Sequence, residues 1–212
     1  MNEYDIIMNQ KTPIQVFDSW AQSGKDKGME DNHHIPVNEM LQSLTRDINK
    51  DFSFIDAGCG NGWVIRTILK NSYCRKAIGV DGSKYMIDNA KSIDPDGKYI
   101  CADLLDWKPN QLVDFVHSME VLYYFKKPGR LLKHIRDTWL KESGKIIIGI
   151  DFYDENTQSH VWPERLNTHM TLCSIEEWNS IFEDSGYFNI KINQINAQDD
   201  FPGTLVIAAD AH

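Results

Sequence analysis

The stretch FSFIDAGCGNGWVIRTIL, residues 52–69, decides the fold because it combines a buried strand, a glycine-rich turn and the start of a helix. Residues 52–55 are apolar apart from Ser53, which is typical of a central strand covered on both faces. Gly58, Gly60 and Gly62 then follow at every second position. Glycines permit positive φ and a close approach of the backbone to a ligand, and the next helix directs free N–H groups toward the turn. The stretch therefore predicts a cofactor site.

Strands and helices alternate around this stretch. Further buried strands are expected at residues 76–81, 97–102, 113–118 and 145–151. Amphipathic helices are expected at residues 37–49 and 61–71, from residue 83, and from residue 128 to residue 144. Such alternation predicts an α/β fold with a doubly wound, mostly parallel sheet.

The last third of the chain has a different pattern. Residues 152–173 show no regular periodicity, and a connection of that length is usually functional or disordered. Its aromatic residues and histidines argue against disorder. Ser174 and Glu177 form a capping box that begins a helix to residue 183. Residues 188–195 and 203–209 then predict an antiparallel hairpin at the edge of the sheet.

Length and charge limit the function. The chain has 212 residues, 42% of them hydrophobic, which suits one domain with a small appendage. The net charge of −9 disfavours a nucleic-acid partner, because phosphate binding needs clustered Lys and Arg. No apolar run approaches the ~20 residues of a membrane span, and the first residues lack a secretory pattern. We expect a cytoplasmic protein without a membrane partner, in which the four cysteines are reduced.

The N-terminal residues do not fit the strand–helix repeat. Residues 14–21 predict a short helix, and Pro36 is expected to begin the next one. Between them, residues 23–34 are polar and glycine-punctuated, which suits either a solvated loop or a lid over the site. We therefore divide the chain into a lid or cap segment, residues 1–36, and a cofactor-binding domain, residues 37–212.

The glycine spacing restricts the cofactor. Dinucleotide sites use G-x-G-x-x-G, and phosphate loops use G-x-x-x-x-G-K-[ST], whereas this chain has G-x-G-x-G. Asp81 lies at the carboxyl end of the next strand, where it can accept hydrogen bonds from a ribose. Asp56, just before the glycines, can face a cationic amine. These residues favour an adenosine-like ligand without a diphosphate.

With these motifs the chain resembles the class I S-adenosylmethionine-dependent methyltransferases, in particular the branch that acts on small molecules. The matching segments are IDAGCGNG (55–62), GVDGSKYMIDNA (79–90) and CADLLDW (101–107). The segments VDFVHSMEVLYYF and LKESGKIIIGID match the fourth and fifth strands in placement. The resemblance covers residues 37–209 and implies a Rossmann-like, seven-stranded sheet that ends in an antiparallel hairpin. It also implies S-adenosyl-L-methionine as the cofactor.

The resemblance assigns the cofactor contacts residue by residue. The glycines would contact the cofactor through backbone, Asp56 would lie near the methionyl amine, Asp81 would hold the ribose and Asp103 the adenine. The residues at the end of the fourth strand would lie beside the sulfonium. The full expected set is Asp56, Gly58, Cys59, Gly60, Asn61, Gly62, Asp81, Gly82, Ser83, Asp103, Leu104, Ser118, Met119 and Glu120.

The expected reaction is an in-line displacement that depends on positioning in a dry pocket. A base is needed where the acceptor is a hydroxyl or a protonated nitrogen or thiol. We choose His160, His169 and Tyr153 as catalytic candidates, because their segment is expected to overhang the pocket. The alternatives are His33, His34, His117, Glu120 and Asp151. No metal is expected, because His117 and Glu120 have no evident third carboxylate beside them.

The acceptor is the least defined part of the prediction. A [DNS]PP[YFW] motif and a Pro-Cys dipeptide, used on DNA bases, are both absent. We therefore expect a small-molecule acceptor and a monomer or homodimer. The alternatives are a protein or peptide methyltransferase, marked by an open groove, and a non-catalytic regulatory module that binds the cofactor. The residues expected to line the substrate pocket are Trp20, Met29, His33, His34, Tyr124 and Trp162.

Overall fold

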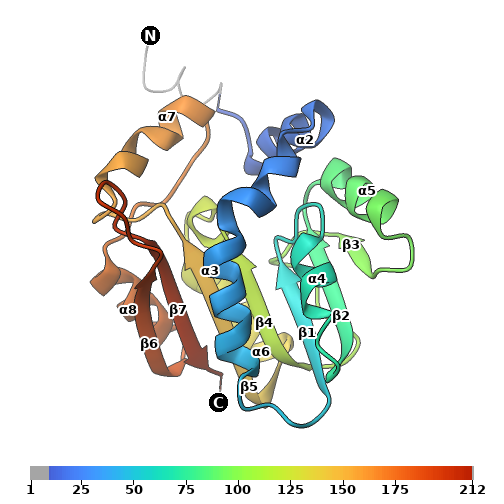
Figure 1. Cartoon of the computed structure of the whole chain (residues 1–212). Helices are drawn as coiled ribbons and strands as arrows, with labels where there is room; N and C mark the ends of the chain where they lie inside the picture. The colour runs from blue at the N-terminus through green and yellow to red at the C-terminus, as the bar shows by residue number, and fades with distance from the viewer. Residues whose placement is uncertain (1–9, 212) are drawn as a thin grey trace.

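A seven-stranded sheet forms the centre of the molecule in the computed structural model, which describes residues 10–211 (Figure 1). The strand order is β3-β2-β1-β4-β5-β7-β6. Strands β1 to β5 run parallel, whereas β7 is antiparallel to both β5 and β6. This confirms the doubly wound sheet with its antiparallel hairpin. The strands are β1 Phe52–Ala57, β2 Cys74–Asp81, β3 Tyr99–Cys101, β4 Val113–Met119, β5 Leu140–Ile150, β6 Phe188–Ile195 and β7 Thr204–Asp210.

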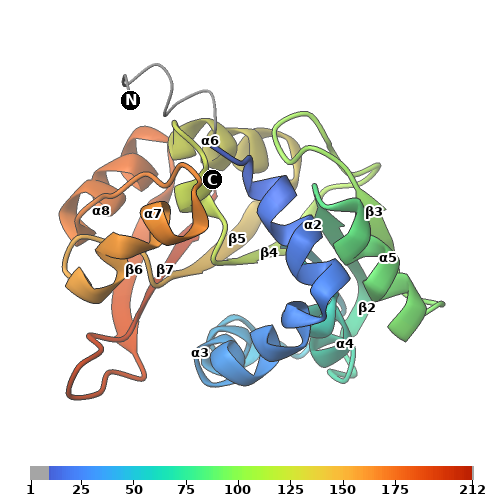
Figure 2. The same ribbon diagram turned by 90° about the horizontal axis from the view of Figure 1, so that it is seen from above.

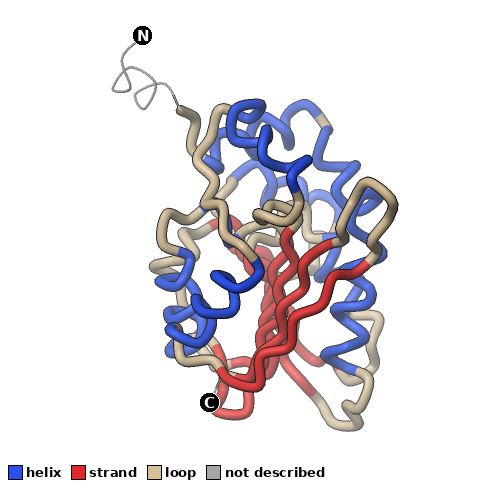
Figure 3. The backbone as a smooth tube through the Cα atoms, turned by 90° about the vertical axis from the view of Figure 1, so that its left-hand side faces the viewer, coloured by secondary structure: helices blue, strands red, loops and turns tan. Residues whose placement is uncertain are grey.

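Helices cover both faces of the sheet (Figures 2 and 3). One apolar cluster joins α3 (Gly28–Thr45), α4 (Trp63–Ile68) and α5 (Lys84–Ile93) to one face. A second cluster joins α6 (Pro128–Thr138) and α8 (Ile175–Asp184) to the other. The central strands are therefore buried on both sides, as their unbroken apolar sequence predicts.

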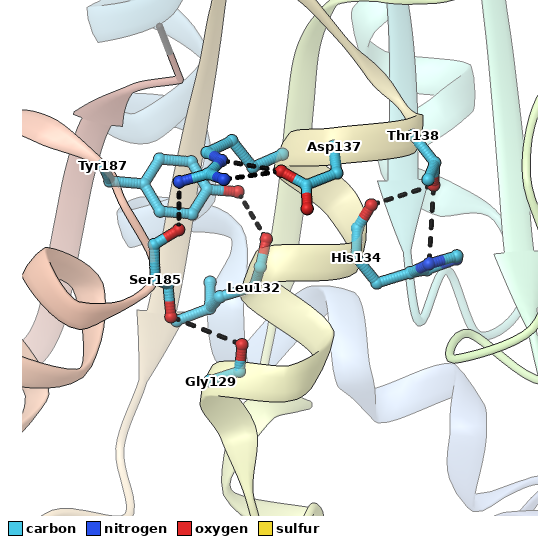
Figure 4. Close-up of polar contacts among 8 residues, drawn as sticks. Gly129, Leu132, His134, Asp137, Thr138, Ser185 and Tyr187 are labelled. Atoms are coloured by element: carbon cyan, nitrogen blue, oxygen red, sulfur yellow. Dashed lines mark hydrogen bonds and ion pairs between the residues drawn. The ribbon is translucent and has the colours of Figure 1, made fainter.

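Helix α8 begins as the sequence predicts. The hydroxyl of Ser174 accepts from the N–H of Glu177, and the Glu177 carboxylate accepts from the N–H of Ser174. Polar contacts then fix the end of α8 against α6 (Figure 4). The hydroxyl of Tyr187 donates to the carbonyl of Leu132 at 2.9 Å, and Arg136 donates to the carbonyl of Ser185 at 2.7 Å. These contacts hold the two helices together as one layer.

The structure corrects the prediction for residues 23–34, which are largely helical. A 3₁₀ turn, η1 (Lys25–Lys27), leads into α3, which runs without a break through Pro36. Proline lacks an N–H group and costs about 3 kcal/mol inside a helix. The helix nevertheless continues, because Val37, Met40, Leu41 and Leu44 bury one face of it against the sheet. Tertiary packing outweighs the local preference, and the domain boundary predicted at residue 36 lies inside this helix.

Residues 152–173 are also more ordered than their sequence indicates. They contain η3 (Thr157–Val161) and α7 (Trp162–Leu166). Thr168 pairs with Lys11 in an isolated parallel bridge, and its hydroxyl donates to the Lys11 carbonyl at 2.9 Å. The N-terminal segment and the 152–173 segment therefore meet each other. Residues 1–9 of the predicted lid lie outside the described part of the chain.

Candidate functional site

A cavity of about 250 Å³ lies at the carboxyl edge of the parallel strands. Its floor comes from the segments that follow β1, β2, β3 and β4, and its roof comes from α2 (Pro13–Ser23) and the start of α3. The strand order reverses between β1 and β4, which is where open α/β sheets bind ligands. Figure 2 shows α2 crossing above this edge.

The glycine turn has the backbone conformation that its sequence predicts. Gly58, Gly60 and Gly62 have φ values of 79°, 51° and 80°, in the left-handed region that favours glycine. A Cβ atom at Gly58 would lie 2.2 Å from Cγ2 of Val121. Gly58 and Gly60 line the cavity, whereas Gly62 turns toward Tyr99. The first two glycines therefore present bare backbone to a ligand.

Asp81 connects the glycine turn to the start of α5. Its Oδ2 accepts from the N–H of Gly60 at 2.9 Å, and its Oδ1 accepts from the N–H of Ser83 at 2.7 Å. Burial raises the pKa of Asp81 to about 6, although these two N–H groups act to lower it. The carboxylate lines the cavity, so hydroxyl donors on a ligand can stabilise the charged form that burial penalises.

These features fit an adenosine-like cofactor with a sulfonium. Bare backbone lines the cavity at Gly58 and Gly60, and Asp81 and Asp103 supply acceptors at the ends of β2 and β3. Leu104 and Met119 add apolar surface. All charged side chains that line the cavity are carboxylates, which suits a cofactor that carries a positive sulfur rather than a diphosphate.

Polar contacts attach the roof to the floor. The hydroxyl of Ser83 donates to Oδ1 of Asp18 on α2 at 2.5 Å. Asp26 on η1 is only 2% exposed, and its Oδ2 accepts from the side-chain amides of Asn61 at 3.3 Å and Asn89 at 3.2 Å. A buried carboxylate needs such donors because its desolvation is costly. The segment predicted to be a loop or lid therefore lies over the glycine turn and is bound to it.

An acidic cluster lies at the end of β4. Glu120 lines the cavity and has a φ of 58°, which is rare for a residue with a side chain and marks candidate functional positions. Its Oε1 accepts from the N–H of Asp151 at 2.5 Å, and its Oε2 accepts from the hydroxyl of Tyr123 at 2.8 Å. Burial, with the nearby charge of Asp151, raises the pKa of Glu120 to about 8. The backbone conformation and two donors thus fix this carboxyl group in one position.

His33 reaches this cluster from α3. Its Nδ1 donates to the carbonyl of Met29 at 3.0 Å, and its Nε2 lies 3.6 Å from Oδ2 of Asp151. Burial alone would lower the pKa of His33, but the contact with Asp151 and the charge of Glu120 raise it to about 9. Donor atoms of His33, Glu120 and Asp151 all lie within 4.8 Å of one another. Sequence reasoning paired Glu120 with His117 and found no further carboxylate beside them, whereas the structure places Asp151 and His33 beside Glu120.

The structure divides the predicted cofactor residues into two groups. Eight line the cavity, namely Gly58, Gly60, Asp81, Gly82, Asp103, Leu104, Met119 and Glu120. The other six, Asp56, Cys59, Asn61, Gly62, Ser83 and Ser118, are buried beside it and bound to protein groups or packed in the core.

Asp56 differs most from its expected place. Its Oδ1 accepts from Nδ1 of His117 at 2.7 Å, and both side chains are at most 2% exposed. The carboxylate thus has a protein partner inside the sheet and does not line the cavity where the cofactor amine was expected.

None of the three predicted catalytic residues lines the cavity. Tyr153 is fully buried and donates to the carbonyl of Gly203 at 2.7 Å. His160 is exposed and contacts the carbonyl of Asp154, and His169 contacts the hydroxyl of Thr171. Of the predicted pocket residues, Met29 and Tyr124 line the cavity and His33 stands behind Glu120, whereas Trp20, His34 and Trp162 do not line it.

Sequence reasoning placed Trp20 of α2 in the substrate pocket, but residues at the start of this helix line the cavity in its place. Thr12, Pro13, Ile14 and Phe17 line it. A signal was present, because the capping box of Thr12 and Gln15 fixes the start of this helix, so that its apolar side chains occur at known positions. The periodicity of the sequence does not show that these side chains face a cavity.

Comparison with known proteins identifies the family. Residues 29–192 match the family model described as a methyltransferase domain. The chain is 31% identical to a trans-aconitate 2-methyltransferase of Enterobacter sp. (strain 638) over 127 residues. These residues cover 59% of this chain and 48% of the relative. The chain thus spans about half the length of this curated relative.

Two solved structures have the same fold. One is a putative methyltransferase in complex with the Haloferax volcanii Trm112 methyltransferase activator, with a TM-score of 0.80, 28% identity and coverage of 92% of this chain and 97% of that one. The other is a possible histamine N-methyltransferase from Thermotoga maritima, with a TM-score of 0.70, 17% identity and coverage of 93% and 99%. Within the described residues, no helix has the length and apolar character needed to span a membrane. The chain therefore belongs to the methyltransferase-domain family.

Proposed function

We propose that this enzyme methylates a small-molecule acceptor held in the cavity beneath α2. The observation that carries the proposal is the roof itself, because a peptide acceptor would need an open groove. Ile14 and Phe17 of α2 and Met29 of α3 all line the cavity opposite the strand ends. The small acceptor named for the curated relatives supports the same class.

The cofactor would lie over the β1, β2 and β3 ends. We assign its backbone contacts to Gly58 and Gly60, its ribose to Asp81 and its adenine to Asp103 and Leu104. When bound, S-adenosylmethionine supplies an electrophilic methyl group on a positively charged sulfur. Met119 and Glu120, at the end of β4, would then face the acceptor.

Glu120 is the base we assign to the acceptor, in place of the residues of the 152–173 segment. It is the residue of the acidic cluster that lines the cavity, and the donors Tyr123 and Asp151 hold its two oxygens. Its pKa of about 8 leaves a working fraction ionised at neutral pH, and a base near the operating pH is the most effective. The α2 and α3 roof would exclude water, which strengthens the interaction between charges in the site.

Labelling with the methyl-tritiated cofactor tests this function. The enzyme is incubated with a cell extract separated into small-molecule and macromolecular fractions, and the label is followed by chromatography. Label in the small-molecule fraction supports the proposal. Label only in macromolecules favours a protein or peptide acceptor, with an activator partner like that of the Haloferax volcanii complex as the next test. Calorimetric binding of the cofactor without label transfer to either fraction would indicate a regulatory module.

A further inference from the structure

The charges on the cavity wall restrict the acceptor. Its charged lining residues are Asp81, Asp103 and Glu120, and no Lys, Arg or His lines it in residues 10–211. Proteins bind carboxylate ligands through Arg, Lys or clustered N–H donors, because a buried anion needs compensating charge. A polyanionic acceptor such as the one named for the curated relatives would instead meet three carboxylates.

The acceptor end of the cavity contains two acids and one basic side chain. Asp81 and Asp103 lie at the cofactor end, at the termini of β2 and β3, which leaves Glu120 at the end of β4. Asp151 follows β5 directly, and its Oδ1 is buried without a hydrogen-bond partner. His33 supplies one positive charge for these two acids. The proton that Glu120 holds at neutral pH balances the second acid, and a cation that enters from the cavity side can take the place of this proton.

Aromatic rings border the same end of the cavity. Phe17 of α2 and Tyr124 both line it and contact each other edge to face, with ring centroids 5.4 Å apart. Phe125 adds a third ring to the wall. Aromatic faces attract cations by about 0.5–2 kcal/mol, most strongly where water is excluded. Carboxylate and rings together form the surroundings that an organic ammonium group prefers.

We propose that the acceptor is a small molecule with an ammonium group, and that Glu120 binds this group within the Phe17 and Tyr124 wall and makes the enzyme specific for amines. This inference rests on the proposed function, since it names the substrate class of that site. It differs from the class that the curated relatives suggest, because those relatives are named for a carboxylate acceptor.

The acidic cluster also suits the chemistry of an amine. An ammonium has no lone pair, so it must lose a proton before it can attack a methyl group. The carboxylate of Glu120 takes that proton, giving a neutral amine and a neutral carboxyl group. The nitrogen lone pair would then form the new bond to the methyl carbon while the bond from that carbon to the sulfonium sulfur breaks. The sulfur keeps the electron pair of that bond, so the products would be the methylated ammonium and the neutral thioether S-adenosylhomocysteine. The groups that face Glu120 are Asp151, Tyr123 and His33. Among them the negative charge of Asp151 favours the proton on Glu120, and the positive charge of His33 opposes it.

Isosteric ligands provide the test. The enzyme, loaded with S-adenosylhomocysteine, is titrated by calorimetry with phenethylamine, tyramine and histamine, with 2-phenylethanol, and with 3-phenylpropanoate and trans-aconitate. We expect at least one amine to bind at least tenfold more tightly than the alcohol and both carboxylates. Glu120→Gln should reduce this preference to within threefold, and the matched exposed-acid variant Glu142→Gln should keep it. Asp151→Asn provides a second variant in case Glu120→Gln does not fold, and it should weaken amine binding in the same direction.

Each outcome decides the inference. Equal or tighter binding of a carboxylate overturns it, as does an unchanged amine preference in a folded Glu120→Gln variant, or no binding by any amine to the loaded enzyme. A requirement for added Mn²⁺, abolished by a chelator, would assign His33, Glu120 and Asp151 to a metal and would also overturn it. Failure of S-adenosylhomocysteine itself to bind would count against the cofactor site instead, so the two failures are distinguishable.

Discussion

Nε2 of His33 lies 3.6 Å from Oδ2 of Asp151, so the helix that roofs the cavity is tied to the end of β5 by an ion pair. The pKa of His33 is raised from 6.5 to about 9, which means that the folded protein holds this proton more tightly than the unfolded chain. The stabilisation is complete below pH 6.5 and is lost as pH rises through about 9. The unfolding midpoint of the ligand-free protein should therefore fall across this interval, as followed by circular dichroism.

Replacing the imidazole provides the control for this slope. His33→Gln should flatten the decline of the unfolding midpoint between pH 6.5 and about 9. The decline at lower pH should remain. Glu120 also has a raised pKa, so its contribution falls from pH 4.5 to about 8 and remains in the variant. A decline of the same steepness in His33→Gln would show that the ion pair does not contribute to stability.

The pH dependence of turnover should identify Glu120. A general base acts in its ionised form, so kcat/KM should rise with pH and level off above about 8. Glu120→Gln should lower kcat/KM by about 10²–10⁴-fold and remove this ascending limb. The rate is measured with whichever acceptor the labelling identifies, with Glu142→Gln as the exposed-acid control. An unaltered limb in the variant would assign the titration to the acceptor itself.

Asp81 should control cofactor affinity. Its carboxylate accepts from the N–H groups of Gly60 and Ser83 and, in our assignment, from the ribose. Hydrogen bonds to charged groups contribute about 1.5–3 kcal/mol, so Asp81→Ala should weaken S-adenosylhomocysteine binding by at least tenfold in calorimetry. Asp96→Ala, at an exposed position before β3, should bind normally. Equal affinities of the two variants would contradict the assignment.

A methyl group at Gly58 should close the cofactor end of the cavity. The new Cβ would lie 2.2 Å from Cγ2 of Val121 and would also be strained by the φ of 79°. Gly58→Ala should cost about 1–3 kcal/mol of folding free energy and abolish measurable cofactor binding. Adding Val121→Ala removes the steric clash but not the backbone strain, so a double-mutant cycle in urea should show partial recovery. If the free-energy effects of the two substitutions were purely additive, the side chain of Val121 would not be what opposes the new methyl group.

The contact between η1 and the glycine turn can be tested through Asp26. Truncation to Ala removes the carboxylate that accepts from the amides of Asn61 and Asn89, which keep only the backbone carbonyls of Asp26 and Ala21 as acceptors. Each lost hydrogen bond costs about 0.5–1.5 kcal/mol. Asp26→Ala should speed hydrogen exchange across α2 and η1 and weaken cofactor binding. Asp26→Asn keeps one acceptor oxygen and should be intermediate, and Asp47→Ala is the exposed control. Unchanged exchange in Asp26→Ala would show that the roof is held by its other contacts.

The fold was largely predictable from sequence because its signals are local. The apolar run before Gly58 and the capping box at Ser174 each define one element, and neither depends on distant contacts. The prediction failed at residues 28–35, where Pro36 and the polar residues favour a loop. The helix there is stabilised by burial of Val37 and Met40 against the sheet, a tertiary effect that a local pattern does not contain.

More of the residues predicted for the cofactor than of those predicted for the acceptor line the cavity, for a similar reason. Gly58, Asp81 and Asp103 follow consecutive strands, so parallel pairing alone brings them to one edge. The cluster of His33, Glu120 and Asp151 joins residues from three elements far apart in sequence. Each of the three was a candidate base from sequence, but only the docking of α3 on β5 brings them together.

The position of Pro36 divides α3 into two parts with different tasks. Proline cannot donate to the carbonyl of Asn32, so α3 lacks one backbone hydrogen bond at this point. The residues before Pro36 form the roof half of the helix, and the residues after it form the core half. Met29 lines the cavity before Pro36, whereas Val37, Met40 and Leu41 after it are buried in the core. Movement of the part before Pro36 would therefore uncover the cavity while the sheet and the core half of the helix keep their packing.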